Sequence, residues 1–204
     1  ASEPKEQDLR SYFSKVAQVD NLQFAPTVFD QLLIKSGFQF SEISKNLSFL
    51  KGYKPDGQIE LEDVTEAIPK TLQDNIFDLT QLILNQRVDE ARSLVSDLRL
   101  QGEDEIKLIA IMLGQFRIFT QVKILSGNGR AESQIVSDLS NYLGRKVNPY
   151  QVKFALKDAR SLDLSFLKKT MACLIETDYQ IKSGLYEKDY LFDLALLRIA
   201  TGNL

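Results

Sequence analysis

Apolar residues recur at helical spacing along almost the whole chain, and this feature constrains the fold more than any other. Leu9, Tyr12, Phe13 and Val16 stand at positions i, i+3, i+4 and i+7, so a helix would place them on one face. Runs that alternate apolar and polar residues, as a half-buried strand does, are short, as in 22–24 and 58–61. The sequence therefore predicts an all-α protein.

Residues that favour helix ends divide this pattern into separate helices. Pro26 suits a first helical turn, and Asp74 or Asn75 can cap the start of a later helix. Gly144 and Gly184 follow apolar runs, at the position where glycine commonly ends a helix. The other helices that this punctuation predicts are 41–52, 62–68, 88–100, 104–126, 132–143, 149–160, 164–181 and 188–200.

A polar stretch from Pro69 to Asn75 separates the early helices from the later ones. The chain has 204 residues, which allows one or two domains at the usual ~100–200 residues per domain. We therefore expect two helical domains, residues 1–68 and residues 69–204.

The composition argues against most enzyme chemistry. Histidine is absent and cysteine occurs once, at Cys173, which removes the commonest general base and any internal disulfide. The chain has neither a Gly-x-x-x-x-Gly-Lys-Ser/Thr loop nor a Gly-x-Gly-x-x-Gly fingerprint. These absences favour a binding or structural role, with no cofactor and no metal.

Three consecutive carboxylates, Glu103, Asp104 and Glu105, stand where helix 104–126 is predicted to begin. The dipole of a helix favours acidic residues at its N-terminus. We therefore interpret them as a helix start rather than as a metal site.

The sequence predicts a cytoplasmic protein with no membrane contact. Uninterrupted apolar stretches stay well below the ~20 residues that a membrane span needs. The first eight residues lack the apolar segment of a signal peptide. The chain does not begin with Met, which is consistent with processing or with a longer parent chain.

Two predicted helices, 106–125 and 188–200, carry apolar residues on more than one face. A helix that is apolar all round is buried. Both helices would then lie at the centre of one bundle, or part of their surface would contact another subunit. A C-terminal helix is usually peripheral, which favours a subunit contact for 188–200. The residues predicted for that interface are Leu191, Phe192, Leu196 and Ile199.

Positive charge gathers in 130–169, although the whole chain has a net charge of −3. Lys153, Lys157 and Arg160 follow one helical face there, and such a stripe suits phosphate groups. Tyr186 lies at a helix end, where an exposed ring can stack on an unpaired base. These four residues are the candidate DNA contacts. The alternative is a solvated basic face and a tyrosine packed on a neighbouring helix.

Residues 132–160 also resemble a helix-turn-helix, although the turn Gly144–Asn148 is longer than the usual three or four residues. An ordinary helical pair is the other interpretation. A DNA-binding regulator is therefore the alternative function.

Several short stretches occur together in a characteristic order and spacing: Ile59–Val64, Asp74–Leu79, Gln101–Glu103, Ile106–Ile109 with Gln115–Arg117, Asn148–Lys153 and Asp178–Gly184. In this order they resemble the delta subunit of the bacterial DNA polymerase III clamp loader, over nearly the whole chain.

The resemblance implies a family architecture of three domains. The first has an AAA+-type fold without the ATP-binding motif, and it contacts and opens the sliding clamp. Residues 1–68 resemble the second domain, a small helical AAA+-type lid. Residues 69–204 resemble the third, a helical-bundle collar that joins the loader pentamer. The clamp-contacting domain is then expected to be missing from this chain.

The function implied is a non-catalytic assembly role in placing the sliding clamp on primed DNA during replication. The expected partners are loader subunits of the tau/gamma and delta-prime types, and primer–template DNA inside the assembled complex. Clamp contact is expected only through the missing domain. The parent complex is a DNA polymerase holoenzyme, a nucleotidyltransferase.

Overall fold

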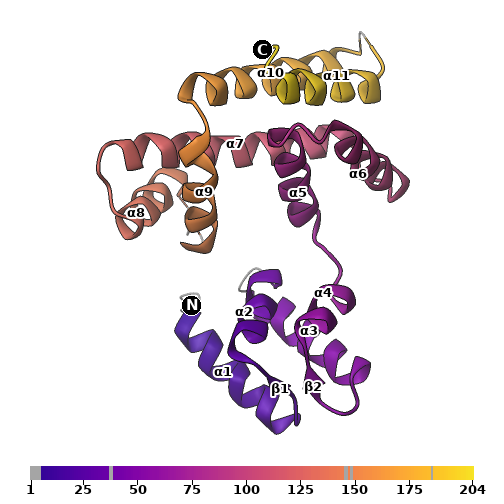
Figure 1. The fold of residues 1–204 in the computed structure, drawn as a ribbon, viewed down its shortest axis with the longest axis vertical. Coiled ribbons are helices and arrows are strands. Elements are labelled where there is room, and N and C mark those ends of the chain that lie inside the picture. The colour runs from indigo at the N-terminus through magenta and orange to yellow at the C-terminus, as the bar shows by residue number, and fades with distance from the viewer. Residues whose placement is uncertain (1–5, 37–38, 145–146, 148, 185) are drawn as a thin grey trace. The chain divides into compact units, whose positions relative to one another are not determined.

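The computed structural model describes residues 6–36, 39–144, 147, 149–184 and 186–204. These residues form eleven helices and one pair of very short strands, which confirms the expected all-α class (Figure 1). The elements are α1 (Glu6–Val19), β1 (Gln23–Phe24), α2 (Pro26–Lys35), α3 (Phe40–Tyr53), β2 (Gln58–Ile59), α4 (Leu61–Ala67), α5 (Leu72–Leu84), α6 (Val88–Leu100), α7 (Glu105–Gly127), α8 (Glu132–Leu143), α9 (Pro149–Ser161), α10 (Leu164–Ser183) and α11 (Lys188–Thr201).

The chain divides into two compact units, Ala1–Thr71 and Leu72–Leu204, each with its own buried core. The first unit contains α1 to α4. Phe13, Leu32 and Ile43 are among its fully buried side chains. The two strands pair in parallel, with Gln23 opposite Gln58 and Phe24 opposite Ile59.

Lys35 ties two helices of the first unit together. It lies in the last turn of α2, and its Nζ donates hydrogen bonds to the carbonyl oxygens of Val64, Thr65 and Ile68 at 3.2, 3.0 and 2.9 Å. The last carbonyls of a helix have no partner within that helix, and cations are favoured there. Lys35 therefore caps the C-terminal end of α4.

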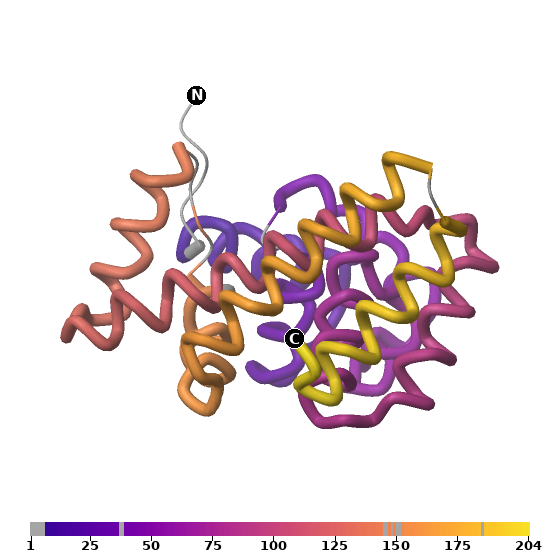
Figure 2. Tube along the Cα trace, turned by 90° about the horizontal axis from the view of Figure 1, so that it is seen from above, coloured from indigo at the N-terminus to yellow at the C-terminus, as the bar shows by residue number. Residues whose placement is uncertain are grey.

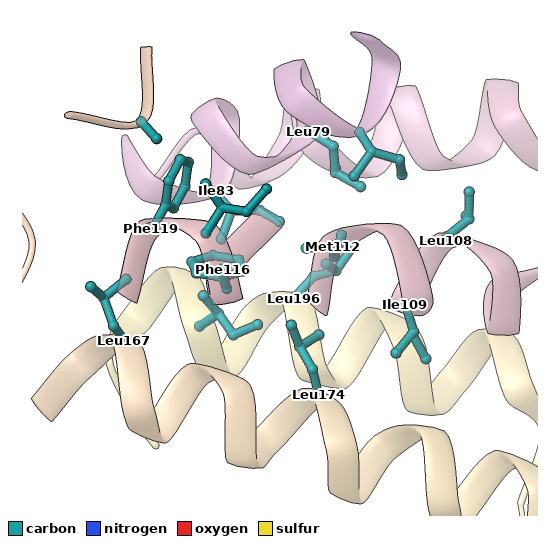
Figure 3. Close-up of a cluster of buried hydrophobic side chains, with 14 of the residues drawn as sticks. Leu79, Ile83, Leu108, Ile109, Met112, Phe116, Phe119, Leu167, Leu174 and Leu196 are labelled. Carbon is teal, nitrogen blue, oxygen red and sulfur yellow. The ribbon is translucent and has the colours of Figure 1, made fainter. Parts of the chain in front are cut away.

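The second unit is built around α7, which contacts α5, α8, α9, α10 and α11. In Figures 1 and 2, α10 runs alongside α7, with α11 beside α10. Leu108, Met112 and Phe116 of α7 are fully buried, and Figure 3 shows them among side chains from neighbouring helices. By length and composition α7 is apolar enough to cross a membrane. Its packing instead makes it the central helix of this bundle.

The helix ends predicted at Pro26, Gly144 and Gly184 are confirmed, and the start predicted at Asp74 or Asn75 is wrong. Asp104 caps α7, accepting from the Ile106 N–H at 2.9 Å, and Asp163 caps α10 by accepting from the Ser165 N–H at 2.8 Å. Gly144 and Gly184 end their helices in the left-handed conformation. Helix α5, however, begins at Leu72, so Asp74 lies inside its first turn instead of capping it. Leu72 packs against the core, so the helix begins before the predicted cap.

Candidate interaction surfaces of the second unit

The four predicted interface residues lie on the inner face of α11. Their exposed fractions are 5% for Leu191, 0% for Phe192, 4% for Leu196 and 2% for Ile199. They pack into the apolar core that also contains residues of α5, α6, α7 and α10. All four are therefore core side chains of the second unit, and a partner contact through them stays a prediction.

A second apolar stripe runs along the opposite face of α11. Tyr190, Leu194 and Leu197 follow one another at i, i+4 and i+7; Tyr190 is 60% exposed, Leu197 is 46% exposed, and Leu194 is half-buried. We call these three residues the outer stripe. The sequence prediction missed it because the two stripes have the same periodicity, and periodicity alone does not say which one faces inward.

Exposed apolar side chains also occur on α10, where Ile175 and Tyr179 are 54% and 66% exposed. An open groove of about 320 Å³ lies between α10 and the C-terminal part of the second unit. Cys173 and Arg198 are among the residues that line it. Burial raises the pKa of the Cys173 thiol above its ordinary 9.0, despite the nearby Arg198 cation, so this thiol is a poor nucleophile.

Lys153, Lys157 and Arg160 are all exposed on α9, on the one face that their spacing predicts. Two further residues lie near this face. Phe154 is 42% exposed beside Lys153, and Lys123 of α7 donates from Nζ to the Arg160 carbonyl oxygen at 3.0 Å. The sequence shows Phe154 next to Lys153, but the position of Lys123 depends on how α7 packs against α9.

Tyr186 is 64% exposed in the connection between α10 and α11. Lys188, two residues later, pairs with Asp104 at the N-terminal end of α7, whereas Lys123 reaches α9 near the other end of α7. Lys123 is nineteen positions after Asp104, which corresponds to about 28 Å along a helix at 1.5 Å per residue. The structure therefore does not bring Tyr186 and the α9 basic face into one site.

Five charged residues from three helices meet where α11 begins. Arg99 donates from Nε to Glu105 Oε1 and from Nη2 to Asp193 Oδ1, both at 2.8 Å. Lys188 donates to the Asp104 carboxylate, and its Nζ is 3.3 Å from Glu105 Oε2. We call Arg99, Asp104, Glu105, Lys188 and Asp193 the Arg99 network. The acidic triplet is thus a helix start with ion-pair partners, and the described residues contain no cluster that could hold a metal ion.

The pKa values of this network follow from its bonds. Two hydrogen bonds lower the pKa of the Asp104 carboxyl below its ordinary 3.8. The one from Lys188 has the larger effect, and the one from the Ile106 N–H has the next largest. The bonds to Asp104 and then to Glu105 raise the pKa of the Lys188 ammonium above 10.5. Burial opposes the charge of Arg99, but the bonds to Asp193 and Glu105 outweigh it and raise the guanidinium pKa. All three groups therefore stay charged near neutral pH.

A family model described as the DNA polymerase III delta subunit, C-terminal domain, matches residues 73–199, well over half of the chain. The chain belongs to the DNA polymerase III delta subunit family. It is 33% identical over 164 residues to DNA polymerase III subunit delta of Bacillus subtilis (strain 168), covering 80% of this chain and 45% of that protein. The solved structure of the Bacillus subtilis DNA clamp loader delta protein matches with a TM-score of 0.82 and 27% identity, covering 98% of this chain and 58% of that one.

This delta-family chain thus spans about half the length of the relatives that it matches. The matched span 73–199 includes both α8 and α9, the helices of the supposed helix-turn-helix. The comparisons therefore place this helix pair in a delta C-terminal domain and give no support to a DNA-binding regulator. Three residues of its turn, Arg145, Lys146 and Asn148, lie outside the described residues.

Proposed function

We propose that this chain is a non-catalytic assembly part of a clamp-loader delta subunit. Residues 1–68 serve as the AAA+-type lid and residues 69–204 as the collar that joins the loader pentamer. The observation that carries the proposal is the delta C-terminal family match over 73–199, together with 98% coverage by a clamp-loader delta structure. The partners are loader subunits of the tau/gamma and delta-prime types. The role is in DNA replication, in the cytoplasm, with no ATP hydrolysis by this chain.

The proposed partner surface is the outer stripe of α11. Its side chains are apolar, and two of them are about half exposed in the isolated chain. Aromatic and apolar side chains of this kind supply the central contacts of protein interfaces. The inner-face residues Phe192 and Leu196 support this surface from beneath by fixing α11 in the core.

Co-purification with the ATPase subunits of the loader tests this proposal. Tyr190→Asp and Leu197→Asp place a charge in the proposed dry contact, and we expect each to reduce recovery of the complex by at least tenfold. Val19→Asp is the control, because Val19 is 82% exposed on α1 of the first unit. Circular dichroism establishes that each variant is folded. Folded Tyr190 and Leu197 variants that assemble normally would exclude the outer stripe as the interface.

We also propose that the assembled complex contacts primer–template DNA through this chain, at one or both of two separate places. Lys153, Lys157 and Arg160 form a basic face on α9 that suits phosphates. Tyr186 offers an exposed ring that can stack on a base. Because these places are far apart in the second unit, each requires its own test.

Junction-DNA binding by the assembled loader tests both places. The double variant Lys153→Glu with Lys157→Glu should weaken binding. The slope of log affinity against log salt concentration should also become shallower, by about one unit for each phosphate that is no longer bound. The charge-matched control is Lys15→Glu with Lys45→Glu, at exposed positions of the first unit. Tyr186→Ala should weaken binding at junctions more than on plain duplex. If a variant leaves both the affinity and the salt slope unchanged, the surface altered in that variant does not contact the DNA.

A further inference from the structure

The start of α11 is held by charge as well as by apolar packing. Lys188 is the first residue of α11, where the positive end of the helix dipole disfavours a cation. Its two carboxylate partners, Asp104 and Glu105, stand at the start of α7, where the dipole favours acids. The position of Lys188 is therefore explained by α7 and not by its own helix.

Arg99 completes this arrangement from the last turn of α6. It bonds Glu105 of α7 and Asp193 of α11, and its Nη2 also donates to the Asp189 carbonyl oxygen at 3.1 Å. The Glu105 side chain is only 4% exposed, so its charge depends on the two cations beside it. Arg99 is thus the one member of the network that bridges α6, α7 and α11.

Because of the charge balance of the network, losing different members should have different effects. With two cations and three carboxylates, it carries one excess negative charge. Losing Arg99 doubles that excess and leaves buried Glu105 with Lys188 alone, which Asp104 also engages. Losing the charge of Glu105 instead leaves two balanced pairs, Arg99 with Asp193 and Lys188 with Asp104.

We propose that the Arg99 network is a local fastening that holds the first turns of α11, with Tyr186 and Glu187 before them, against the end of α6 and the start of α7. When the network is broken, this end of α11 opens more often as a unit, while its C-terminal half stays docked through residues such as Leu196 and Ile199. The segment that opens is 186–193, which includes Tyr186. Because the buried Leu191 and Phe192 leave the core with it, the open state stays a minor population. This inference rests only on the contacts within the second unit and stands independently of the proposed function.

Amide hydrogen exchange of the purified chain, followed peptide by peptide, tests the fastening. We expect Arg99→Met to speed exchange in 186–193 by tenfold or more, while α8 changes by less than twofold. Glu105→Gln should have a clearly smaller effect than Arg99→Met, because it relieves the excess negative charge. Arg87→Met is the matched control, since Arg87 pairs with Glu90 at the start of α6, at the opposite end of that helix from Arg99.

A second measurement needs no variant. Raising the salt concentration from 0.05 to 0.5 M shortens the screening length from about 14 to about 4 Å, which weakens exposed ion pairs such as Lys188 with Asp104. Exchange in 186–193 should then rise more than exchange in α8. An equal rise throughout the second unit, or unchanged exchange in 186–193 in both experiments, would overturn the proposal. So would a Glu105→Gln effect as large as that of Arg99→Met.

Discussion

Gly57 is a single residue on which the first unit depends. Its φ is +74°, and a Cβ added there would lie 2.2 Å from the Asn21 carbonyl oxygen. The Gly57 carbonyl oxygen also accepts from the Gln23 N–H at 2.8 Å, which holds the strand pair in register. The close approach of the two chain segments therefore requires a residue without a side chain.

Gly57→Ala should destabilise the first unit by about 2 kcal/mol or more, from the left-handed backbone and the clash with Asn21 together. Gly52→Ala is the control, because Gly52 lies in α3 with open space where a Cβ would be. It should stabilise by about 0.5–1 kcal/mol. Denaturant unfolding followed by circular dichroism measures both changes. A neutral Gly57→Ala would mean that the turn before β2 relaxes at little cost.

The raised pKa of Asp158 predicts that the stability of the second unit depends on pH. Burial raises the pKa of its carboxyl above the ordinary 3.8, although the bond from Gln81 and the charge of Lys157 act in the opposite direction. Because the folded-state pKa is raised, the ionised group costs stability above that pKa. The cost is relieved as the pH falls toward and below 3.8, where Asp158 is protonated in both folded and unfolded states.

Asp158→Asn should therefore stabilise the second unit at pH 7, by less than about 1 kcal/mol, because the new amide oxygen still accepts from Gln81. The advantage should shrink as the pH is lowered and vanish below about 3.8. Thermal unfolding of both proteins between pH 3 and pH 7 provides the comparison. A loss of stability at pH 7 would mean that attraction to Gln81 and Lys157 outweighs the cost of burial.

Helix α11 has two apolar faces, and substitutions on them should have different effects on stability. Phe192 is fully buried in the core, and Leu197 is nearly half exposed on the outer stripe. Phe192→Ala should cost about 3–5 kcal/mol through lost burial and the cavity that it leaves. Leu197→Ala, its control on the same helix, should stay within about 0.5 kcal/mol. Chemical denaturation of the second unit measures both; equal losses would mean that α11 packs differently.

At the scale of the whole molecule, the chain consists of two units joined near Thr71. Residues 69–71 lie outside the helices, and all three are exposed. We expect trypsin to cut first after Lys70, because exposed, non-helical backbone enters a protease most readily. Lys157 and Arg160 serve as internal controls, since they lie in α9 and should resist longer. A protected core that runs through residues 68–75 would contradict two separately folding units.

The sequence alone determined the helices and most of their ends. The caps at Asp104 and Asp163 and the stops at Gly144 and Gly184 depend on local backbone chemistry, so they could be predicted from the residues themselves. The basic face of α9 was predictable for the same reason, because helical spacing alone aligns Lys153, Lys157 and Arg160.

Only the tertiary structure decided which surfaces stay exposed and which charges meet. The inner face of α11 and its outer stripe have the same period, and the choice between them depends on how α11 packs against helices far earlier in the chain. The bond from Lys188 to Asp104 joins residues 84 positions apart, and that from Arg99 to Asp193 joins residues 94 apart. Local propensity carries no information about such pairs, because they form only when the helices have packed.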